Sequence, residues 1–215
     1  NVLDQVWPTG APISVAHLGG GALTLARYVQ ATRPGSPQLV IEIERELPTL
    51  VTTALPLPPG TDLQLVIGDA REELAALGDR RFDAIVLDVF SGESTPDHLA
   101  GRDFFGDALG HLERDGLMLV NVGDDAGQRF VTSQVRELEQ ATAERGLSGV
   151  WTLTHAPLLT TPAGGNMVLL AGGALSSSQV EQWRTAWKAA GPHPAAVLDP
   201  VETSRAFART DRRRS

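Results

Sequence analysis

Residues 13–27 read ISVAHLGGGALTLAR, and residues 39–44 read LVIEIE. In the first stretch an apolar strand pattern leads into three glycines (19–21) and then into a helical pattern. Glycines let the backbone turn tightly and come close to a ligand, and a carboxylate further along can accept hydrogen bonds from ribose hydroxyls. Because Glu42 stands at the end of the next strand pattern, the two stretches together predict a nucleotide or nucleoside site.

The composition excludes several classes of protein. With 215 residues, 42% of them apolar, the chain can form one domain with a packed core. Its formal net charge of −8 argues against nucleic-acid partners, which require a basic surface. There is no cysteine, which excludes disulfides, thiolate catalysis and zinc–cysteine sites. Because no apolar run reaches membrane-spanning length and no signal peptide is visible, we expect a cytoplasmic protein without membrane contact.

Apolar runs alternate with helical patterns along most of the chain. This alternation predicts an α/β fold in which helices cover both faces of a mostly parallel, seven-stranded sheet. The expected strands are 13–18, 39–43, 63–67, 82–87, 116–122, 149–155 and 166–171. The last two are joined by a turn-rich stretch without a helical pattern, which favours an antiparallel pair. We therefore expect the sheet to end with one reversed strand.

We expect residues 1–190 to form a single nucleoside-binding domain. Its last helix is predicted at 176–190, begins with a serine cap and carries Trp183 and Trp187 on one packing face. The remaining residues, 191–215, are rich in proline and arginine and are predicted to be a C-terminal tail that frays.

Acidic residues stand where successive strands end, which is the edge at which parallel sheets bind ligands. Asp69 and Asp88 follow the third and fourth expected strands, and each could instead cap a loop or helix. Asp88 ends the most apolar strand and precedes a long loop, 89–102, of the kind that is usually functional in a compact domain. His98 lies in this loop, whereas His17 lies inside the first strand and is expected to be a core residue. The histidines show no metal-ligand spacing.

In this order, the motifs resemble those of the spermidine synthases, polyamine aminopropyltransferases that share the Rossmann-like fold of S-adenosylmethionine-dependent methyltransferases. The family's first turn, Gly-Gly-Gly-Asp-Gly, corresponds here to Gly19-Gly20-Gly21-Ala22-Leu23. Its second motif, Glu-Ile-Asp, corresponds to Glu42-Ile43-Glu44, and its third, Gly-Asp-Ala, to Gly68-Asp69-Ala70. Its fourth, Asp-x-x-Asp-Pro, corresponds to Asp88-Val89-Phe90-Ser91-Gly92. The resemblance runs from about residue 13 to residue 122.

The resemblance implies a transferase that moves an aminopropyl group from decarboxylated S-adenosylmethionine to an amine such as putrescine. Glu42 would hold the ribose of this donor, Asp69 would contact its adenine, and Asp88 would accept a proton from the attacking amine. No metal is expected, because the sulfonium of the donor is already a good leaving group. The full set of expected site residues is Asp88 for catalysis, Gly19, Gly20, Gly21, Glu42, Ile43, Asp69 and Ala70 for the donor, and Ser91, Pro96 and His98 on the substrate-side loop.

Two departures from the family pattern leave alternatives open. The acid of the family's glycine turn is Ala22 here, and the second acid of the fourth motif is Ser91. The family's N-terminal β-domain, which completes the substrate cleft, is also absent from this stretch. An acid at position 22 would repel the carboxylate of ordinary S-adenosylmethionine, so its loss favours a methyltransferase. A further alternative is a non-catalytic protein that binds a nucleoside or serves as a scaffold. The expected partners are a nucleoside donor and an amine acceptor, and the resemblance implies a homodimer.

Overall fold

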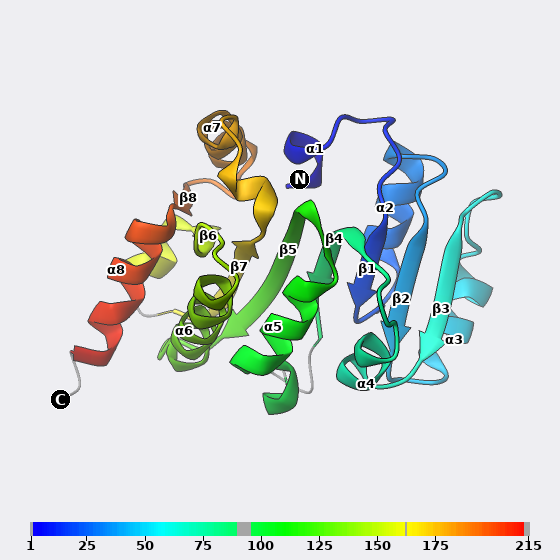
Figure 1. Ribbon diagram of the computed structural model, residues 1–215, viewed down its shortest axis with the longest axis horizontal. Helices are drawn as coiled ribbons and strands as arrows, with labels where there is room; N and C mark the ends of the chain where they lie inside the picture. The colour runs from blue at the N-terminus through cyan, green and yellow to red at the C-terminus, as the bar shows by residue number, and fades with distance from the viewer. Residues whose placement is uncertain (1, 90–95, 162, 213–215) are drawn as a thin grey trace.

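In the computed structural model, which describes residues 2–89, 96–161 and 163–212, an eight-stranded sheet lies between two layers of helices (Figure 1). The strand order across the sheet is β3-β2-β1-β4-β5-β7-β6-β8. Strands β1 to β5 pair in parallel, whereas β7 pairs antiparallel with both β5 and β6, and β8 pairs antiparallel with β6. The predicted α/β fold, mostly parallel with reversal near its C-terminal end, is confirmed, but two strands, β7 and β8, are reversed where one was expected.

The strands are β1 (Val15–Leu18), β2 (Gln38–Glu42), β3 (Leu63–Ile67), β4 (Phe82–Leu87), β5 (Leu112–Asp124), β6 (Trp151–His155), β7 (Gly165–Ala171) and β8 (Ala195–Leu198). The α-helices are α1 (Leu3–Val6), α2 (Thr24–Thr32), α3 (Leu47–Ala54), α4 (Ala70–Ala75), α5 (Arg102–Gly110), α6 (Arg129–Glu144), α7 (Val180–Ala190) and α8 (Pro200–Arg212). Three short 3₁₀ helices complete the described elements: η1 (Asp97–Leu99), η2 (Ala156–Leu159) and η3 (Gly173–Ser176). Within the described ranges, no helix has both the length and the apolar character needed to cross a membrane.

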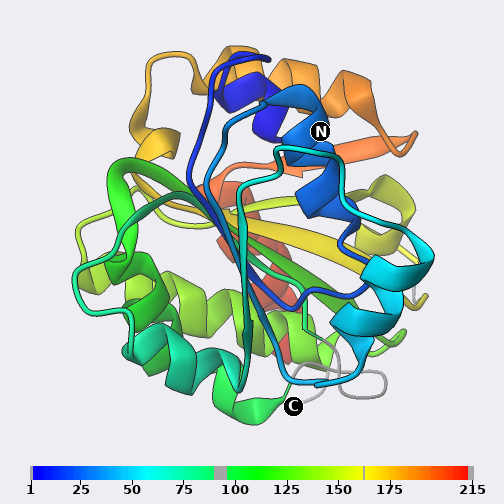
Figure 2. The same cartoon turned by 90° about the vertical axis from the view of Figure 1, so that its right-hand side faces the viewer.

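The core has two sides because alternate residues of each strand face opposite helical layers. On β5, for example, Leu117 and Leu119 pack with α1, α2 and α7, whereas Met118 and Val120 pack with α4, α5, α6 and α8. Figure 2 shows the two layers on either side of the sheet, with the blue and orange helices on one side and the green and red helices on the other. The central strands are therefore buried on both faces, as expected for a sheet of this kind, whereas the edge strand β3 is partly exposed.

The C-terminal region differs from the sequence-based expectation of a fraying tail after residue 191. Here β8 adds an eighth strand beside β6, and α8 packs on α6 with Phe207 buried. A capping box begins α8: the Glu202 backbone N–H donates to Asp199 Oδ1 (2.8 Å), and the Asp199 N–H donates to Glu202 Oε2 (3.0 Å). These bonds satisfy backbone groups that would otherwise favour fraying. The serine cap predicted for the preceding helix is wrong, because α7 begins after Gln179 with no side-chain cap.

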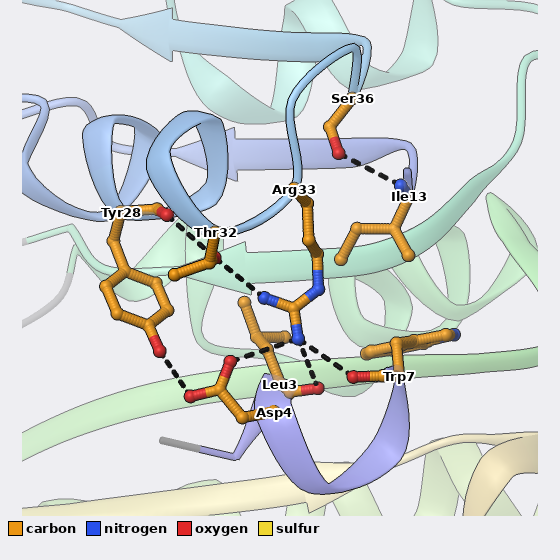
Figure 3. Close-up of polar contacts among 8 residues, drawn as sticks. All are labelled: Leu3, Asp4, Trp7, Ile13, Tyr28, Thr32, Arg33 and Ser36. Carbon is orange, nitrogen blue, oxygen red and sulfur yellow. Dashed lines mark hydrogen bonds and ion pairs between the residues drawn. The ribbon is translucent and has the colours of Figure 1, made fainter. Parts of the chain in front are cut away.

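A fully buried arginine links the N-terminal helix α1 to the end of α2 (Figure 3). Arg33 follows the last turn of α2, and its Nη2 donates to the carbonyl oxygens of Leu3 (3.2 Å) and Trp7 (2.9 Å) and to Asp4 Oδ1 (3.0 Å). Its Nη1 donates to Thr32 Oγ1 at 2.9 Å. Because the guanidinium cannot lose its proton, its burial depends on these partners.

Replacing this arginine should therefore destabilise the fold. We expect Arg33→Met to lower the free energy of unfolding by about 3–5 kcal/mol, because Asp4 and two carbonyl groups lose their buried partner. Urea denaturation at neutral pH measures the change. Arg136→Met is the matched control, because Arg136 is 61% exposed and pairs with Glu137 at the surface. Equal losses in both variants would contradict the structural role of Arg33.

Candidate active site

The glycine turn after β1 brings three neighbouring strands together at the carboxyl edge of the sheet. Gly19 has a φ of +95°, and a Cβ on it would lie 2.3 Å from the carbonyl oxygen of Asp88, so only glycine is accommodated. A Cβ on Gly20 would lie 2.9 Å from Val40 Cγ1 on β2. Gly21 has a φ of +47° and is exposed. The turn therefore lies in close contact with both β2 and β4.

Glu42 closes this turn from the end of β2. Its Oε2 accepts hydrogen bonds from the backbone N–H groups of Gly20 (2.9 Å) and Gly21 (3.3 Å), and its Oε1 accepts one from Glu44 N–H (2.9 Å). The side chain is 7% exposed. An ionised carboxylate offers about four acceptor positions, so Glu42 retains capacity for a further hydrogen-bond donor. The next residue, Ile43, is 61% exposed and presents an apolar surface at the same edge.

Asp69 begins α4 as its N-cap, directly after Gly68 and before the buried Ala70. Its Oδ1 accepts from the backbone N–H groups of Arg71 (2.9 Å) and Glu72 (3.2 Å). The capping interpretation of Asp69, which the sequence left open, is therefore correct for one oxygen. The other oxygen, Oδ2, is available to a different partner.

That partner is His98 on η1, whose Nε2 lies 2.7 Å from Asp69 Oδ2. The Arg71 side chain also donates to the His98 carbonyl oxygen at 3.1 Å. Burial opposes ionisation of Asp69, but the hydrogen bonds from His98, Glu72 and Arg71 outweigh it and hold its pKa below the usual 3.8. Pro96, just before η1, is half-buried, and η1 contacts α4. The C-terminal end of the predicted loop 89–102 therefore packs against α4.

The Asp69–His98 contact predicts a defined response to acid. Because the pKa of folded Asp69 lies below its unfolded value, the contact stabilises the fold above about pH 4, and this contribution is lost as pH falls through the folded pKa. We expect His98→Ala to raise the pKa of Asp69, as followed by ¹³C NMR of its carboxyl carbon. His111→Ala serves as the control, because His111 bonds to the Arg80 carbonyl oxygen instead. An unchanged Asp69 pKa in His98→Ala would exclude the imidazole as the cause.

Asp88 lies at the carboxyl end of β4, exposed and linked to two asparagines on neighbouring strands. Asn121 Nδ2 on β5 donates to Asp88 Oδ1 at 2.8 Å, and Asn166 Nδ2 on β7 donates to Asn121 Oδ1 at 3.4 Å. The predicted site did not include Asn121 and Asn166. They come together only because β7 inserts next to β5, so that Gly123 faces Asn166 across the strand pair. Ser91, predicted on the loop after Asp88, lies outside the described residues.

His17 is the core residue that the sequence predicts. Its Nε2 lies 2.9 Å from Gln38 Oε1, and Gln38 Nε2 in turn donates to the Ala26 carbonyl oxygen at 3.2 Å. Burial lowers the pKa of His17 to about 4, partly offset by the bond to Gln38, so that the imidazole is neutral at pH 7. His17 therefore takes no part in proton transfer at the exposed edge.

The chain is similar in sequence to known proteins over part of its length. No protein-family model matches the chain. A curated polyamine aminopropyltransferase of Vibrio vulnificus is 28% identical over 137 residues, which make up 63% of this chain and 43% of that protein. The chain resembles the polyamine aminopropyltransferases. It spans less than half the length of this relative.

Solved structures agree on the fold. A probable spermidine synthase from Corynebacterium glutamicum superposes with a TM-score of 0.82 at 24% identity, covering 96% of this chain and 74% of that one. Human methyltransferase-like protein 13, in complex with SAH, gives a TM-score of 0.61 at 17% identity, covering 99% of this chain and 86% of that one. The motifs indicated a resemblance to aminopropyltransferases, and the sequence comparison confirms it. The superposed structures confirm the methyltransferase-like fold.

Proposed function

We propose that the chain is a transferase that moves an aminopropyl group from decarboxylated S-adenosylmethionine to an amine. One observation carries this proposal: the glycine turn lies between the ends of β2 and β4, with the Glu42 carboxylate bonded to Gly20 and the Asp88 backbone carbonyl close to Gly19. A nucleoside held by Glu42 would extend its sulfonium toward Asp88. The likeness to curated polyamine aminopropyltransferases supports the same assignment.

The donor's nucleoside would lie over the ends of β1, β2 and β3. Glu42 would accept the ribose hydroxyls with the acceptor capacity that its three backbone bonds leave. The exposed Ile43 would pack against the purine, with Ala70 at the edge of the same surface. Asp69 Oδ2 would accept from the adenine amino group, which requires it to share or replace the hydrogen bond from His98.

The transfer itself requires an amine that has lost its proton, because a protonated amine has no lone pair. Asp88 is exposed and stands at the strand end beside the turn, where it can accept that proton. The amine nitrogen then forms a bond to the propyl carbon as the carbon–sulfur bond breaks. The bonding pair passes to sulfur, and the neutral thioether methylthioadenosine leaves. Alignment of nitrogen, carbon and sulfur supplies much of the rate.

Asp88→Asn tests the assignment of the base. It keeps the side-chain size and an acceptor oxygen for Asn121, and we expect turnover to fall by about 10²–10⁴-fold with nearly unchanged donor affinity. The assay supplies a panel of amines with each of the two sulfonium donors. Asp107→Asn, an equal change on the exposed side of α5, is the control. Wild-type turnover in Asp88→Asn would remove this residue from the mechanism.

A second candidate, methyl transfer from ordinary S-adenosylmethionine, is favoured by one residue. Ala22 is exposed in the glycine turn, where spermidine synthases carry an acid, so nothing at this position would repel the donor's carboxylate. The same wild-type assay separates the candidates by product, since aminopropyl transfer releases methylthioadenosine and methyl transfer releases S-adenosylhomocysteine. Absence of both products, with methylthioadenosine still bound, would favour the non-catalytic alternative.

Glu42→Gln tests the nucleoside site. The substitution keeps the side-chain size and one acceptor oxygen but removes the charge, so that methylthioadenosine should bind about 1.5–3 kcal/mol more weakly by calorimetry. Glu46→Gln, the same change at an exposed residue of the same segment, should leave the affinity unchanged. Unaltered binding in Glu42→Gln would refute the ribose assignment.

A further inference from the structure

The Asp88 carboxylate is held on one side by a side chain that the proposed transfer step does not use. Asn121 on β5 is half-buried, and its Nδ2 donates to Asp88 Oδ1 at 2.8 Å. Within the described ranges, the other oxygen, Oδ2, accepts no hydrogen bond. An exposed carboxylate can rotate about its side-chain bonds, so the bond from Asn121 limits the positions that Oδ2 can take.

The register of the sheet explains why these two side chains meet. Leu87 pairs with Val120 in the parallel ladder between β4 and β5. The next residues on the two strands, Asp88 and Asn121, are therefore neighbours at the carboxyl edge. Val120 packs with the layer formed by α4, α5, α6 and α8, so Asn121 points to the opposite face of the sheet. Backbone pairing thus places the amide beside the carboxylate.

A second asparagine determines which end of the Asn121 amide faces Asp88. Asn166 on β7 donates from Nδ2 to Asn121 Oδ1 at 3.4 Å. In the antiparallel ladder, Asn121 stands opposite Val168, two residues from Asn166, so the two asparagines lie diagonally on one face of the sheet. With its oxygen bonded to Asn166, the Asn121 amide presents its N–H groups to Asp88. The reverse orientation would direct the amide oxygen at the carboxylate, which repels it.

We infer that Asn121, oriented by Asn166, is a positioning residue for Asp88: it engages Oδ1, so that Oδ2 accepts the proton of the attacking amine. The inference rests on the proposed transfer. As the N–H bond of the amine breaks, an O–H bond forms at Oδ2, and the nitrogen keeps the electron pair with which it attacks the propyl carbon. An amide cannot serve as the base itself, so the two asparagines act through the direction that they give to Asp88.

Turnover of single variants tests this role. The assay uses the amine that the wild type converts fastest. We expect kcat to fall by about tenfold in Asn121→Leu and by about threefold in Asn166→Leu, because each change leaves the Asp88 carboxylate less well directed. The affinity for methylthioadenosine, measured by calorimetry, should stay unchanged in both. Gln64→Leu removes an exposed amide from the edge strand β3 and is the control, with wild-type kcat expected.

Double variants distinguish positioning from a merely structural effect. If Asn121 acts through Asp88, Asn121→Leu should not lower kcat further in an Asp88→Asn background. Asn166→Leu should likewise add nothing in an Asn121→Leu background. Independent losses would instead multiply. Multiplied losses in the double variants, or wild-type kcat in Asn121→Leu, would overturn the inference.

Nuclear magnetic resonance tests the contact without turnover. The chain contains three asparagines, Asn1, Asn121 and Asn166, so ¹⁵N-asparagine labelling of the full chain gives few side-chain amide signals, and the two leucine variants assign them. We expect an Asn121 amide proton to move upfield in Asp88→Ala, which removes its charged acceptor, and in Asn166→Leu, which releases the amide. Gln64→Leu should not move it. An unchanged Asn121 signal in Asp88→Ala would also overturn the inference.

The two measurements separate this inference from the proposed function. If the Asn121 signal responds as expected but the wild type converts no amine with either donor, the hydrogen-bonded arrangement stands and the proposed transfer fails. If amines are converted and Asp88→Asn lowers kcat while Asn121→Leu does not, the transfer stands and the positioning role fails.

Discussion

The backbone contact between Gly19 and Asp88 is the constraint on which the site depends. The turn after β1 reaches the carbonyl oxygen of Asp88 so closely that a Cβ would lie 2.3 Å away. With this approach, Gly20 and Gly21 direct their N–H groups to Glu42 on the opposite side. Three strands are thereby held at one edge, and the two acidic residues that the proposed chemistry needs flank a single turn, Glu42 through its carboxylate and Asp88 through its backbone.

Glu42 and Asp69 stabilise the local backbone in addition to their proposed binding roles. Glu42 accepts three backbone hydrogen bonds, and Asp69 caps α4 while it holds His98. Removing either side chain would leave partly buried backbone N–H groups without these partners, at up to about 1 kcal/mol for each. For this reason, conservative amide substitutions report on ligand binding more clearly than alanine at these positions. Asp88 differs, because its own side chain is exposed and, within the described residues, accepts a hydrogen bond from the half-buried Asn121.

Local patterns predicted the parts of the fold that depend on neighbours in sequence. The apolar alternation located β1 to β7, and the Gly19–Gly21 turn, Glu42, Asp69 and Asp88 were all expected at strand ends, where the structure has them. The sequence analysis did not predict β8, because its short apolar run directly follows Pro192 and Pro194. The capping box at the start of α8, formed by Asp199 and Glu202, is nevertheless visible in the sequence. Asn166 could not be foreseen either, since its place beside Asn121 depends on which strands β7 separates. The binding roles of the site residues remain predictions.

The position of β7 also determines how the sheet is completed. This strand follows β6 in the chain but lies between β5 and β6, and it is their only connection through the ladder of described strands. Until residues 165–171 are in place, β6 and β8 have no hydrogen-bonded link to the parallel strands. A ribosome-bound chain can pair β1 to β5 as they emerge, because each of β2 to β5 pairs with a strand that precedes it in the chain. The remainder of the sheet joins only when β7 pairs with β5, because among the described strands β6 and β8 reach the parallel strands through β7 alone.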